Sequence, residues 1–320
     1  GKPMEWKVRK KWFDAAEDNP VNMEKAVELL NECSRPVILA GGGVNISGAH
    51  NELRSFAEKI KAPVCATLMG MGAFPGEHPC FLGMVGMHGT RYANYAVSNS
   101  DCLIAIGARF SDRVISKVEA FAPKARIIHI DIDPAEISKN VTAHIPIYGD
   151  VKELLSELIE RVPEREESSW NRQIDEWKEN YPLKYRGKSA LSPQLVIEKL
   201  YELTKGKAII TTEVGQNQMW AAQYYKYSEP RTFITSGGLG AMGYGLGASI
   251  GAALGRPDKK VINIAGDGSF KMNSTELATV SKYQVPIVQL VLNNHTLGMV
   301  RQWQDLFFQG RFSHSTLGPD

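Results

Sequence analysis

Short apolar runs alternate with amphipathic stretches through the first half of the chain. The apolar runs end at glycine or at polar residues, as buried parallel strands do, and they cover residues 36–40, 63–67, 102–107 and 126–132. Apolar residues at helical spacing occur at 22–35, 48–60, 92–99 and 152–161. This alternation predicts a parallel sheet covered by helices on both faces, in a first domain that covers residues 1–162.

A second alternating block follows a polar interval. We interpret residues 163–192 as a linker, whose one amphipathic helix, with Trp170, Ile174 and Trp177, lies on the surface of a neighbouring domain. Strands are then predicted at 208–212, 232–235, 261–265 and 287–292, and helices at 193–204, 240–254 and 273–283. The chain is therefore expected to be an α/β protein of two doubly wound parallel-sheet domains, the second covering 193–320 and incomplete at its C-terminal end.

Composition and charge fit an ordinary globular chain. The 320 residues are 43% apolar and 22% charged, with a formal net charge of +2 and no clustered Lys and Arg, so no nucleic-acid partner is expected. The four cysteines form no CxxC pair, which indicates reduced thiols in a cytoplasmic protein.

One uncharged stretch, residues 232–255, is long enough to cross a bilayer. Glycine recurs in it at positions 243, 247, 251 and 255, a spacing found in membrane helices and equally in helices packed closely on a sheet. Because the stretch begins like a strand and its glycines lower its hydrophobicity, we expect a sheet-packed helix and no membrane partner.

The strongest chemical signal is a pair of motifs at the ends of two predicted strands. Gly266, Asp267, Gly268 and Ser269 follow one strand, and an Asn-Asn pair that includes Asn294 follows the next. Carboxyl ends of parallel strands are where open α/β sheets bind ligands, and Mg²⁺ prefers oxygen ligands from carboxylates, amides and phosphates. The alternative is a plain Asp-Gly turn with an unrelated Asn pair. The spacing of the two motifs favours Mg²⁺ bound to a diphosphate.

With these motifs the chain resembles the large catalytic subunit of the acetolactate synthase (acetohydroxyacid synthase) family, within the thiamin diphosphate enzymes. The two strand-end motifs are typical of thiamin diphosphate enzymes in general, and the segment 298–304 (Gly-Met-Val-Arg-Gln-Trp-Gln) narrows the resemblance. Similar segments extend over nearly the whole chain, at 39–44, 67–75, 86–90, 107–114, 129–137, 214–223, 236–253, 266–270 and 293–304.

The resemblance implies roles for individual residues of the second block. It assigns Mg²⁺ to Asp267, Asn294 and the carbonyl of Thr296. It assigns thiamin diphosphate to Val214, Gly215, Gln216, Asn217, Gly240, Met242, Gly266, Gly268 and Ser269. It implies catalytic roles for Met242, which would support the bent cofactor, and for Gln216, Met299, Trp303 and Arg113. Met242 as a core methionine and Trp303 as a packed aromatic are the structural alternatives. Two positions depart from the family pattern, since Gly247 replaces a usual Pro and Asn217 a frequent His.

The first block carries a second set of residues at or just beyond strand ends. Arg109 and nearby backbone amides could face a pyrophosphate, and Asp131 could face a ribose. The resemblance implies that this ligand is FAD, without net redox work, and that Arg113 anchors the carboxylate of the second substrate. A simple glycine turn, a helix cap at Asp131 and a surface ion pair at Arg113 are the alternatives. The expected FAD residues are Gly41, Gly42, Gly43, Met87, His88, Gly89, Gly107, Arg109, Arg113, Val114, Asp131, Ile132, Glu136, Gly149 and Asp150.

The resemblance also implies the reaction and the partners. Thiamin diphosphate would decarboxylate pyruvate and transfer the two-carbon unit to a second 2-keto acid, giving acetolactate or acetohydroxybutyrate for branched-chain amino-acid synthesis. Partners would be 2-keto acids, a second copy in a homodimer or homotetramer, and a small regulatory subunit. The family's catalytic glutamate belongs to a preceding pyrimidine-binding domain that this chain lacks, so the 320 residues alone are expected to be inactive. Glyoxylate carboligase, pyruvate oxidase and a non-catalytic nucleotide-binding fragment are the alternatives.

Overall fold

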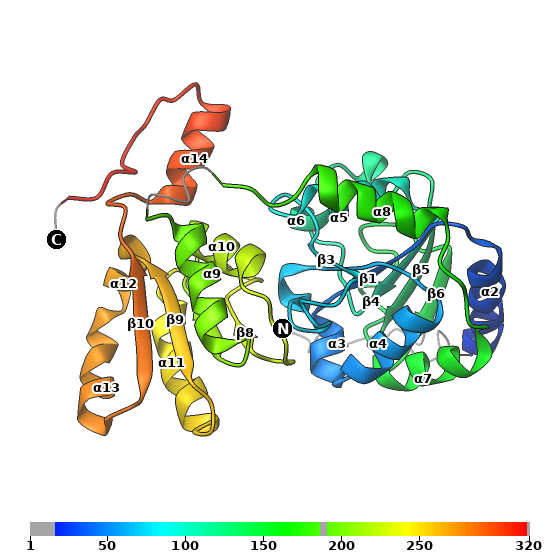
Figure 1. The fold of residues 1–320 in the computed structure, drawn as a ribbon, viewed down its shortest axis with the longest axis horizontal. Coiled ribbons are helices and arrows are strands. Elements are labelled where there is room, and N and C mark those ends of the chain that lie inside the picture. The colour runs from blue at the N-terminus through cyan, green and yellow to red at the C-terminus, as the bar shows by residue number, and fades with distance from the viewer. Residues whose placement is uncertain (1–16, 186–190, 319–320) are drawn as a thin grey trace, which may run out of the picture. The chain divides into compact units, whose positions relative to one another are not determined.

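The computed structural model describes residues 17–185 and 191–318, which divide into two compact units. One unit runs to Ala73 and resumes over Cys80–Pro182, and the other comprises Phe74–Pro79 and the chain from Leu183 onward. Each unit contains its own sheet, so each is described by itself (Figure 1).

The first unit is built on a fully parallel sheet. In its described residues the strand order is β3-β2-β1-β4-β5-β6, and all pairs are parallel. The strands are β1 (Pro36–Ala40), β2 (Val64–Ala66), β3 (Phe81–Met84), β4 (Cys102–Ile106), β5 (Arg126–Asp131) and β6 (Ile145–Tyr148). The helices are α2 (Asn19–Glu32), α3 (Gly42–Ser47), α4 (His50–Lys59), α5 (Arg91–Asn99), α6 (Asp112–Ile115), α7 (Val151–Arg161) and α8 (Ser169–Asn180).

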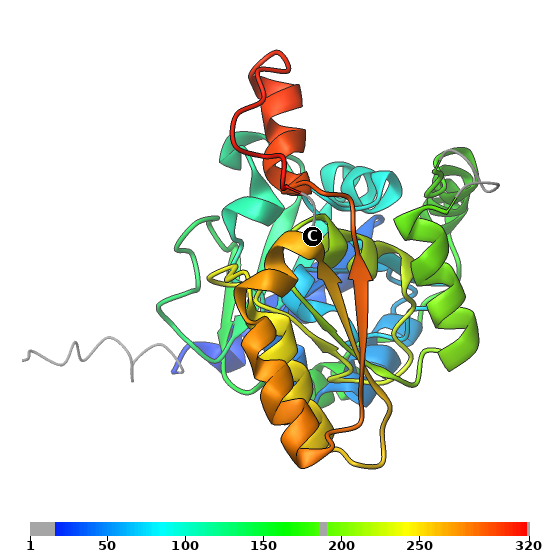
Figure 2. The ribbon, with the colours of Figure 1, turned by 90° about the vertical axis from the view of Figure 1, so that its left-hand side faces the viewer.

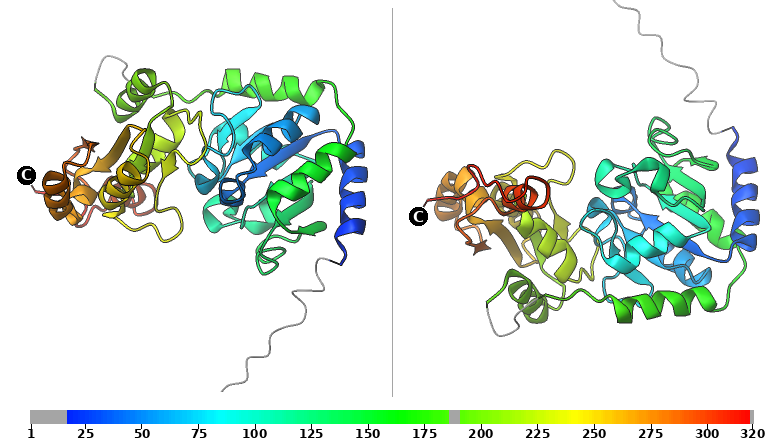
Figure 3. Two further views of the ribbon diagram at one scale, coloured as in Figure 1. Left: turned by 90° about the horizontal axis from the view of Figure 1, so that it is seen from below. Right: turned by 90° about the horizontal axis from the view of Figure 1, so that it is seen from above.

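Helices cover the two faces of this sheet. One face packs against α5 and α8, whose side chains Ala93, Val97, Trp170 and Ile174 join those of β1 and β4 in a buried cluster. α3, α4 and α7 pack against one another on the other side of the sheet (Figure 3). The helix within residues 163–192 is thus α8, and Trp170 Nε1 donates to the carbonyl of Pro36 at 3.1 Å.

The second unit has a parallel sheet in the order β10-β9-β7-β8 among its described residues. Its strands are β7 (Ile209–Thr212), β8 (Phe233–Ile234), β9 (Val261–Gly266) and β10 (Ile287–Leu292). Its helices are α9 (Pro193–Thr204), α10 (Gln216–Tyr224), α11 (Tyr244–Gly255), α12 (Asp267–Met272), α13 (Leu277–Tyr283) and α14 (Gly298–Phe307). In Figure 2 the viewer looks onto this unit, with β10 in orange at the edge of its sheet. Both domains are parallel-sheet α/β structures, as predicted.

Several boundaries differ from the prediction for identifiable reasons. The helix predicted from residue 240 begins at Tyr244, because Gly240 and Gly243 adopt left-handed φ angles of +73° and +89°. β3 and β6 were not predicted, since they are four-residue strands at the two edges of the sheet and contain Gly83 and Pro146. The short helices α3, α6, α10 and α12 were also missed, because they carry mixed polar and small residues without a clear apolar stripe. The amphipathic helix α14 was missed as well, although its apolar residues recur at helical spacing.

The uncharged stretch 232–255 forms β8, a turn and α11, not one continuous helix. None of the helices described is long and apolar enough to span a membrane. The four cysteines, all within the described residues, form no disulfide, as predicted; three of them are buried and Cys80 is partly exposed.

Candidate active site

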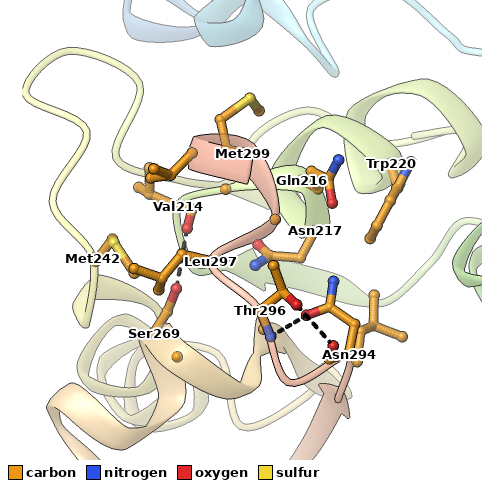
Figure 4. A pocket seen from close by; sticks show the side chains of 16 residues that line it. Val214, Gln216, Asn217, Trp220, Met242, Ser269, Asn294, Thr296, Leu297 and Met299 are labelled. Atoms are coloured by element: carbon orange, nitrogen blue, oxygen red, sulfur yellow. Dashed lines mark hydrogen bonds between the residues drawn. The ribbon is translucent and has the colours of Figure 1, made fainter. Parts of the chain in front are cut away.

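A pocket opens at the carboxyl ends of β7, β9 and β10, with about 450 Å³ of empty space that includes its open mouth. Figure 4 shows its lining, with Met242 and Asn294 on opposite sides. Eleven residues that the sequence assigned to cofactor, metal or catalysis line it: Val214, Gly215, Gln216, Asn217, Met242, Gly266, Gly268, Ser269, Asn294, Thr296 and Met299. Trp220, Leu292, Leu297, Gly298 and Val300 line it as well and were not predicted.

Asp267 is a buried acid next to the pocket, between the lining residues Gly266 and Gly268. It follows β9 directly and is only 3% exposed. Its Oδ1 accepts the N–H of Asn294 at 3.5 Å, which brings the loop after β10 beside it. Its Oδ2 is buried and has no hydrogen-bond partner among the described residues. A buried carboxylate oxygen without a partner is costly, so this atom is suited to a cation that the protein itself does not supply.

The loop after β10 presents further oxygens. Asn294 Oδ1 accepts the N–H of Thr296 at 3.0 Å, and the Thr296 hydroxyl donates to the Asn294 carbonyl at 3.1 Å. A short antiparallel bridge joins Thr296 to Thr316, and Leu297 N–H donates to the Ser315 carbonyl at 2.8 Å. The returning segment therefore fixes the loop that carries two of the expected metal ligands.

These donors fit Mg²⁺ held jointly with a phosphate. Within residues 17–185 and 191–318 no three His, Cys, Asp or Glu side chains gather where they could hold a metal ion. Mg²⁺ is commonly bound through one or two carboxylates, with water and substrate phosphates completing its octahedron. Asp267 as the single carboxylate, with amide and carbonyl oxygens from Asn294 and Thr296 nearby, matches that pattern.

The loop after β7 forms the wall above Asp267. Ser269 Oγ donates to the Val214 carbonyl at 3.0 Å, which ties this loop to α12. Gly215 has φ +138°, a conformation that L side chains rarely adopt. Asn217 is 5% exposed, and its Oδ1 is buried without a partner in the described chain. Gln216 Nε2 donates to Gln302 Oε1 at 2.9 Å, linking the wall to α14.

Apolar side chains close the remaining sides of the pocket. Met242 lines it from the turn before α11, and Leu297 and Met299 line it from the start of α14. A Cβ on Gly268 would lie 2.7 Å from Leu297 Cδ2, so a side chain at this position would have to displace that of Leu297. The lining combines neutral polar and apolar groups, and the buried acid Asp267 lies next to it, as expected for a ligand with a charged end and an apolar body.

Four predicted residues do not line this pocket, and one of them is Asp267, which lies buried between the lining residues Gly266 and Gly268. Gly240 is exposed on the turn before α11. Trp303 lies on α14, 40% exposed, with its ring 5.0 Å from that of Phe307. Arg113 belongs to the first unit and pairs with Asp112.

Sequence reasoning missed a buried glutamate next to the pocket. Glu213 follows β7 and is fully buried, and its carboxylate accepts the N–H groups of Gly243 at 2.7 Å and of Leu246 at 3.1 Å. Burial raises the pKa of Glu213 above its ordinary value, and the hydrogen bonds from these backbone N–H groups offset this rise only in part. The only signal in the sequence was an acidic residue directly after an apolar strand.

The first unit gathers its predicted residues at the carboxyl ends of its strands. The glycine cluster has a packing role there: Gly43 N–H donates to the Gly107 carbonyl at 3.0 Å, and a Cβ on Gly43 would lie 2.6 Å from the Gly107 Cα. Large apolar side chains are exposed on the segments that follow four of these strands, namely Ile46, Met69, Met87 and Ile132. Arg109, after β4, is exposed as well.

Other predicted residues of this unit already have local partners. Asp150 Oδ1 accepts the Lys152 N–H at 2.8 Å as the cap of α7, and Asp131 Oδ1 accepts the Asp133 N–H at 2.9 Å. Glu136 pairs with Lys139 at 2.9 Å. Burial, and then the charge of Arg113, lower the pKa of His88. The remaining members, Gly41, Gly42, Gly89, Val114 and Gly149, lie on the same loops or just beyond the strand ends.

Both units match domains of a known protein family. Residues 23–158 match the central domain of thiamine pyrophosphate enzymes, and residues 213–320 match their C-terminal TPP binding domain. The chain therefore belongs to the thiamine pyrophosphate enzymes, and the pocket lies in the domain that gives this family its name.

The individual relatives that match this chain include several acetolactate synthases. The chain is 51% identical over 310 residues to a probable acetolactate synthase large subunit of Methanocaldococcus jannaschii, covering 94% of this chain and 52% of that protein. It is 50% identical over 307 residues to acetolactate synthase 2, chloroplastic, of Nicotiana tabacum, covering 94% of this chain and 46% of that protein. The acetolactate synthase large subunit of Buchnera aphidicola subsp. Schlechtendalia chinensis is 48% identical over 301 residues, covering 92% of this chain and 52% of that protein. The chain spans about half the length of these curated relatives.

Proposed function

We propose that the pocket binds thiamin diphosphate with Mg²⁺ and that the protein acts as an acetolactate synthase large subunit. The observation that carries the cofactor site is the buried, unpaired Oδ2 of Asp267 beside Asn294 and Thr296. Asp267, the Asn294 amide oxygen and the Thr296 carbonyl would hold the cation. The loop from Val214 to Gln216 and Ser269 would face the diphosphate.

Calorimetric titration tests the cofactor site directly. We expect the chain to bind thiamin diphosphate only when Mg²⁺ is present, and Asp267→Ala and Asn294→Ala each to abolish detectable binding, because each removes one oxygen from an octahedron that tolerates little distortion. Asp258→Ala, at an exposed acid in the turn before β9, is the matched control and should bind normally. Unchanged affinity in both pocket variants would refute the metal assignment.

The similarity at about 50% identity supports the reaction class. Bound thiamin diphosphate supplies the electron sink for decarboxylating a 2-keto acid. The chain's own residues would press the cofactor into its reactive shape through Met242, and would exclude water through Leu297, Met299 and Val300. The proposed reaction joins pyruvate to a second 2-keto acid, as a transferase in branched-chain amino-acid biosynthesis.

A product assay separates this reaction from those of sibling enzymes. The chain should be assayed with pyruvate alone and after mixing with the part of the Methanocaldococcus jannaschii relative that lies outside the matched region. We expect acetolactate from the mixture and none from this chain alone. Tartronate semialdehyde from glyoxylate, or acetyl phosphate from pyruvate, would instead indicate glyoxylate carboligase or pyruvate oxidase chemistry.

We further propose that the first unit binds FAD. The exposed Ile46, Met69, Met87 and Ile132, which follow four strands of one parallel sheet, suit a planar apolar ring system, and Arg109 nearby suits a pyrophosphate. Refolding with excess FAD should give a yellow protein with quenched flavin fluorescence, and Arg109→Ala should weaken the binding. Arg172→Ala, on α8, is the control. A colourless product from the unaltered chain would refute the assignment.

The remaining roles are proposals about substrates and assembly. Trp303, partly exposed on α14, would contact the larger second keto acid. In the active mixture, Trp303→Leu should lose about 1–3 kcal/mol of preference for 2-ketobutyrate over pyruvate as second substrate. An unaltered product ratio would leave Trp303 a packing residue. We also propose a cytoplasmic homodimer or homotetramer that a small regulatory subunit can join, which ultracentrifugation of the active mixture would test.

A further inference from the structure

The turn that carries Met242 into the pocket has little packing of its own. Residues 238–241 are all exposed, and Leu239 is 93% exposed. Within the turn, Ala241 N–H donates to Ser236 Oγ at 3.0 Å and Gly237 N–H to the Thr235 carbonyl at 3.1 Å. The contacts that hold Met242 in position must therefore be made mainly by the next residue in the chain.

That residue, Gly243, is held at both of its backbone polar groups. Glu213 Oε2 accepts its N–H at 2.7 Å, and Asn273 Nδ2 donates to its carbonyl at 2.8 Å. Gly243 has φ +89°, and a Cβ there would lie 3.1 Å from Asn273 Nδ2, so the close approach and the backbone conformation both require glycine.

Glu213 also connects this turn to two further parts of the site. Its own N–H donates to the Ile264 carbonyl at 3.0 Å on β9, the strand that ends next to Asp267. Its Oε1 accepts the N–H of Leu246 at 3.1 Å, in the first turn of α11. The Glu213 side chain thus links the end of β7 to the Met242 turn and to the start of α11. The Glu213 backbone N–H bonds to β9.

The chemistry of these contacts requires a carboxylate. Both oxygens of Glu213 accept backbone N–H groups, and the positive end of the helix dipole of α11 favours a negative charge there. A glutamine of the same shape offers one acceptor, and its NH₂ group would face an N–H donor. Glutamine therefore keeps the volume but loses one of the two hydrogen bonds.

We propose that Glu213 and Asn273 are positioning residues of the cofactor pocket, which together clamp Gly243 and hold Met242 in place. The inference deepens the proposed thiamin diphosphate site and rests on it for its functional meaning. Neither side chain lines the pocket, so both act through Met242.

A double-mutant cycle tests this coupling. Calorimetry should show Mg²⁺–thiamin diphosphate bound roughly tenfold more weakly by Glu213→Gln than by the parent chain, the effect of one lost charge-assisted hydrogen bond. In a Met242→Ala background, Glu213→Gln should weaken binding much less than tenfold, because the residue through which it acts is gone. An equal loss in both backgrounds would overturn the proposal. Glu202→Gln, at an exposed glutamate of α9, is the matched control.

A second readout does not depend on the cofactor. With ¹³C-methyl-labelled methionine, the Met242 signal is identified by its absence from Met242→Ala. Both Glu213→Gln and Asn273→Ala should shift this signal and narrow it as the turn becomes mobile, while the control leaves it unchanged. An unmoved Met242 signal in both variants would overturn the clamp. Failure of the parent chain to bind the cofactor would refute the proposed function alone, because the methyl experiment still decides the geometry.

Discussion

A buried polar atom without a hydrogen-bond partner indicates a ligand site only where it lies at or beside a pocket. Such an atom costs about 1–3 kcal/mol. Two such atoms in the described chain meet this condition: Asn217 lines the pocket, and Asp267 lies between its lining residues Gly266 and Gly268. His129 is a different case in the first unit: it is fully buried, its Nε2 bonds with the Ala108 carbonyl at 2.9 Å, and its ring stacks edge-on with Phe110. Its Nδ1 is buried without a partner in the described chain, and the contacts with Ala108 and Phe110 point to a structural role.

We predict a pH-dependent stability that originates at His129. Burial lowers its pKa below the ordinary value of 6.5, and the nearby Asp131 and Glu136 and the bond with Ala108 offset this only in part. The unfolded chain then binds the proton more tightly, so stability is retained above pH 6.5 and falls as the pH drops toward the folded pKa. Urea unfolding at about pH 7.5 and pH 5.5 should show a loss of about 1 kcal/mol that His129→Gln removes. The same loss in parent and variant would assign the effect to other groups.

At the scale of elements, α11 shows how one helix uses glycine in two ways. A Cβ on Gly245 would overlap Asn263 Oδ1 and lie 2.8 Å from the Thr212 carbonyl carbon, so this glycine allows the helix to approach β7 and β9. Gly247 and Gly251 have nothing within 4 Å of the position of an added Cβ, and there glycine only weakens the helix.

This contrast predicts opposite effects for two substitutions on the same helix. Gly245→Ala should destabilise the second unit by about 1–3 kcal/mol, because the backbone of β7 cannot move aside. Gly247→Ala should stabilise it by about 0.5–1 kcal/mol, since alanine restricts the unfolded chain and favours the helix. Denaturant unfolding of the parent chain and of the two variants measures both changes in stability. A tolerated Gly245→Ala would show that α11 lies farther from the sheet than described.

Whether an element can be predicted from the sequence depends on the burial pattern of its residues. The central strands β1, β4 and β9 are buried at nearly every position and read as uninterrupted apolar runs, so they and the strand-end residue Asp267 were predictable. The edge strands β3 and β6 alternate over only four residues, too few to recognise. Glu213 could not be assigned, because the Gly243 amide that it binds lies 30 residues farther along the chain.

For the whole molecule, the two units each contain a sheet, a core and one proposed ligand site. The pocket residues from Val214 to Val300 all belong to the second unit, and the proposed FAD residues all belong to the first. A ligand that binds only the folded form of one unit stabilises that unit in proportion to its occupancy. The two proposed cofactors should therefore act on different parts of the chain.

Hydrogen exchange measured by mass spectrometry makes this separation testable. Mg²⁺ with thiamin diphosphate at about 100 times its Kd should raise the protection of β7 and β9 by the equivalent of about 2.7 kcal/mol, and leave β1 and β5 unchanged. FAD should protect β1 and β5 and leave β7 and β9 unchanged. Asp267→Ala should remove the first effect and retain the second, which serves as an internal control. Equal protection of both sheets by either ligand would show that the units are coupled and do not respond independently.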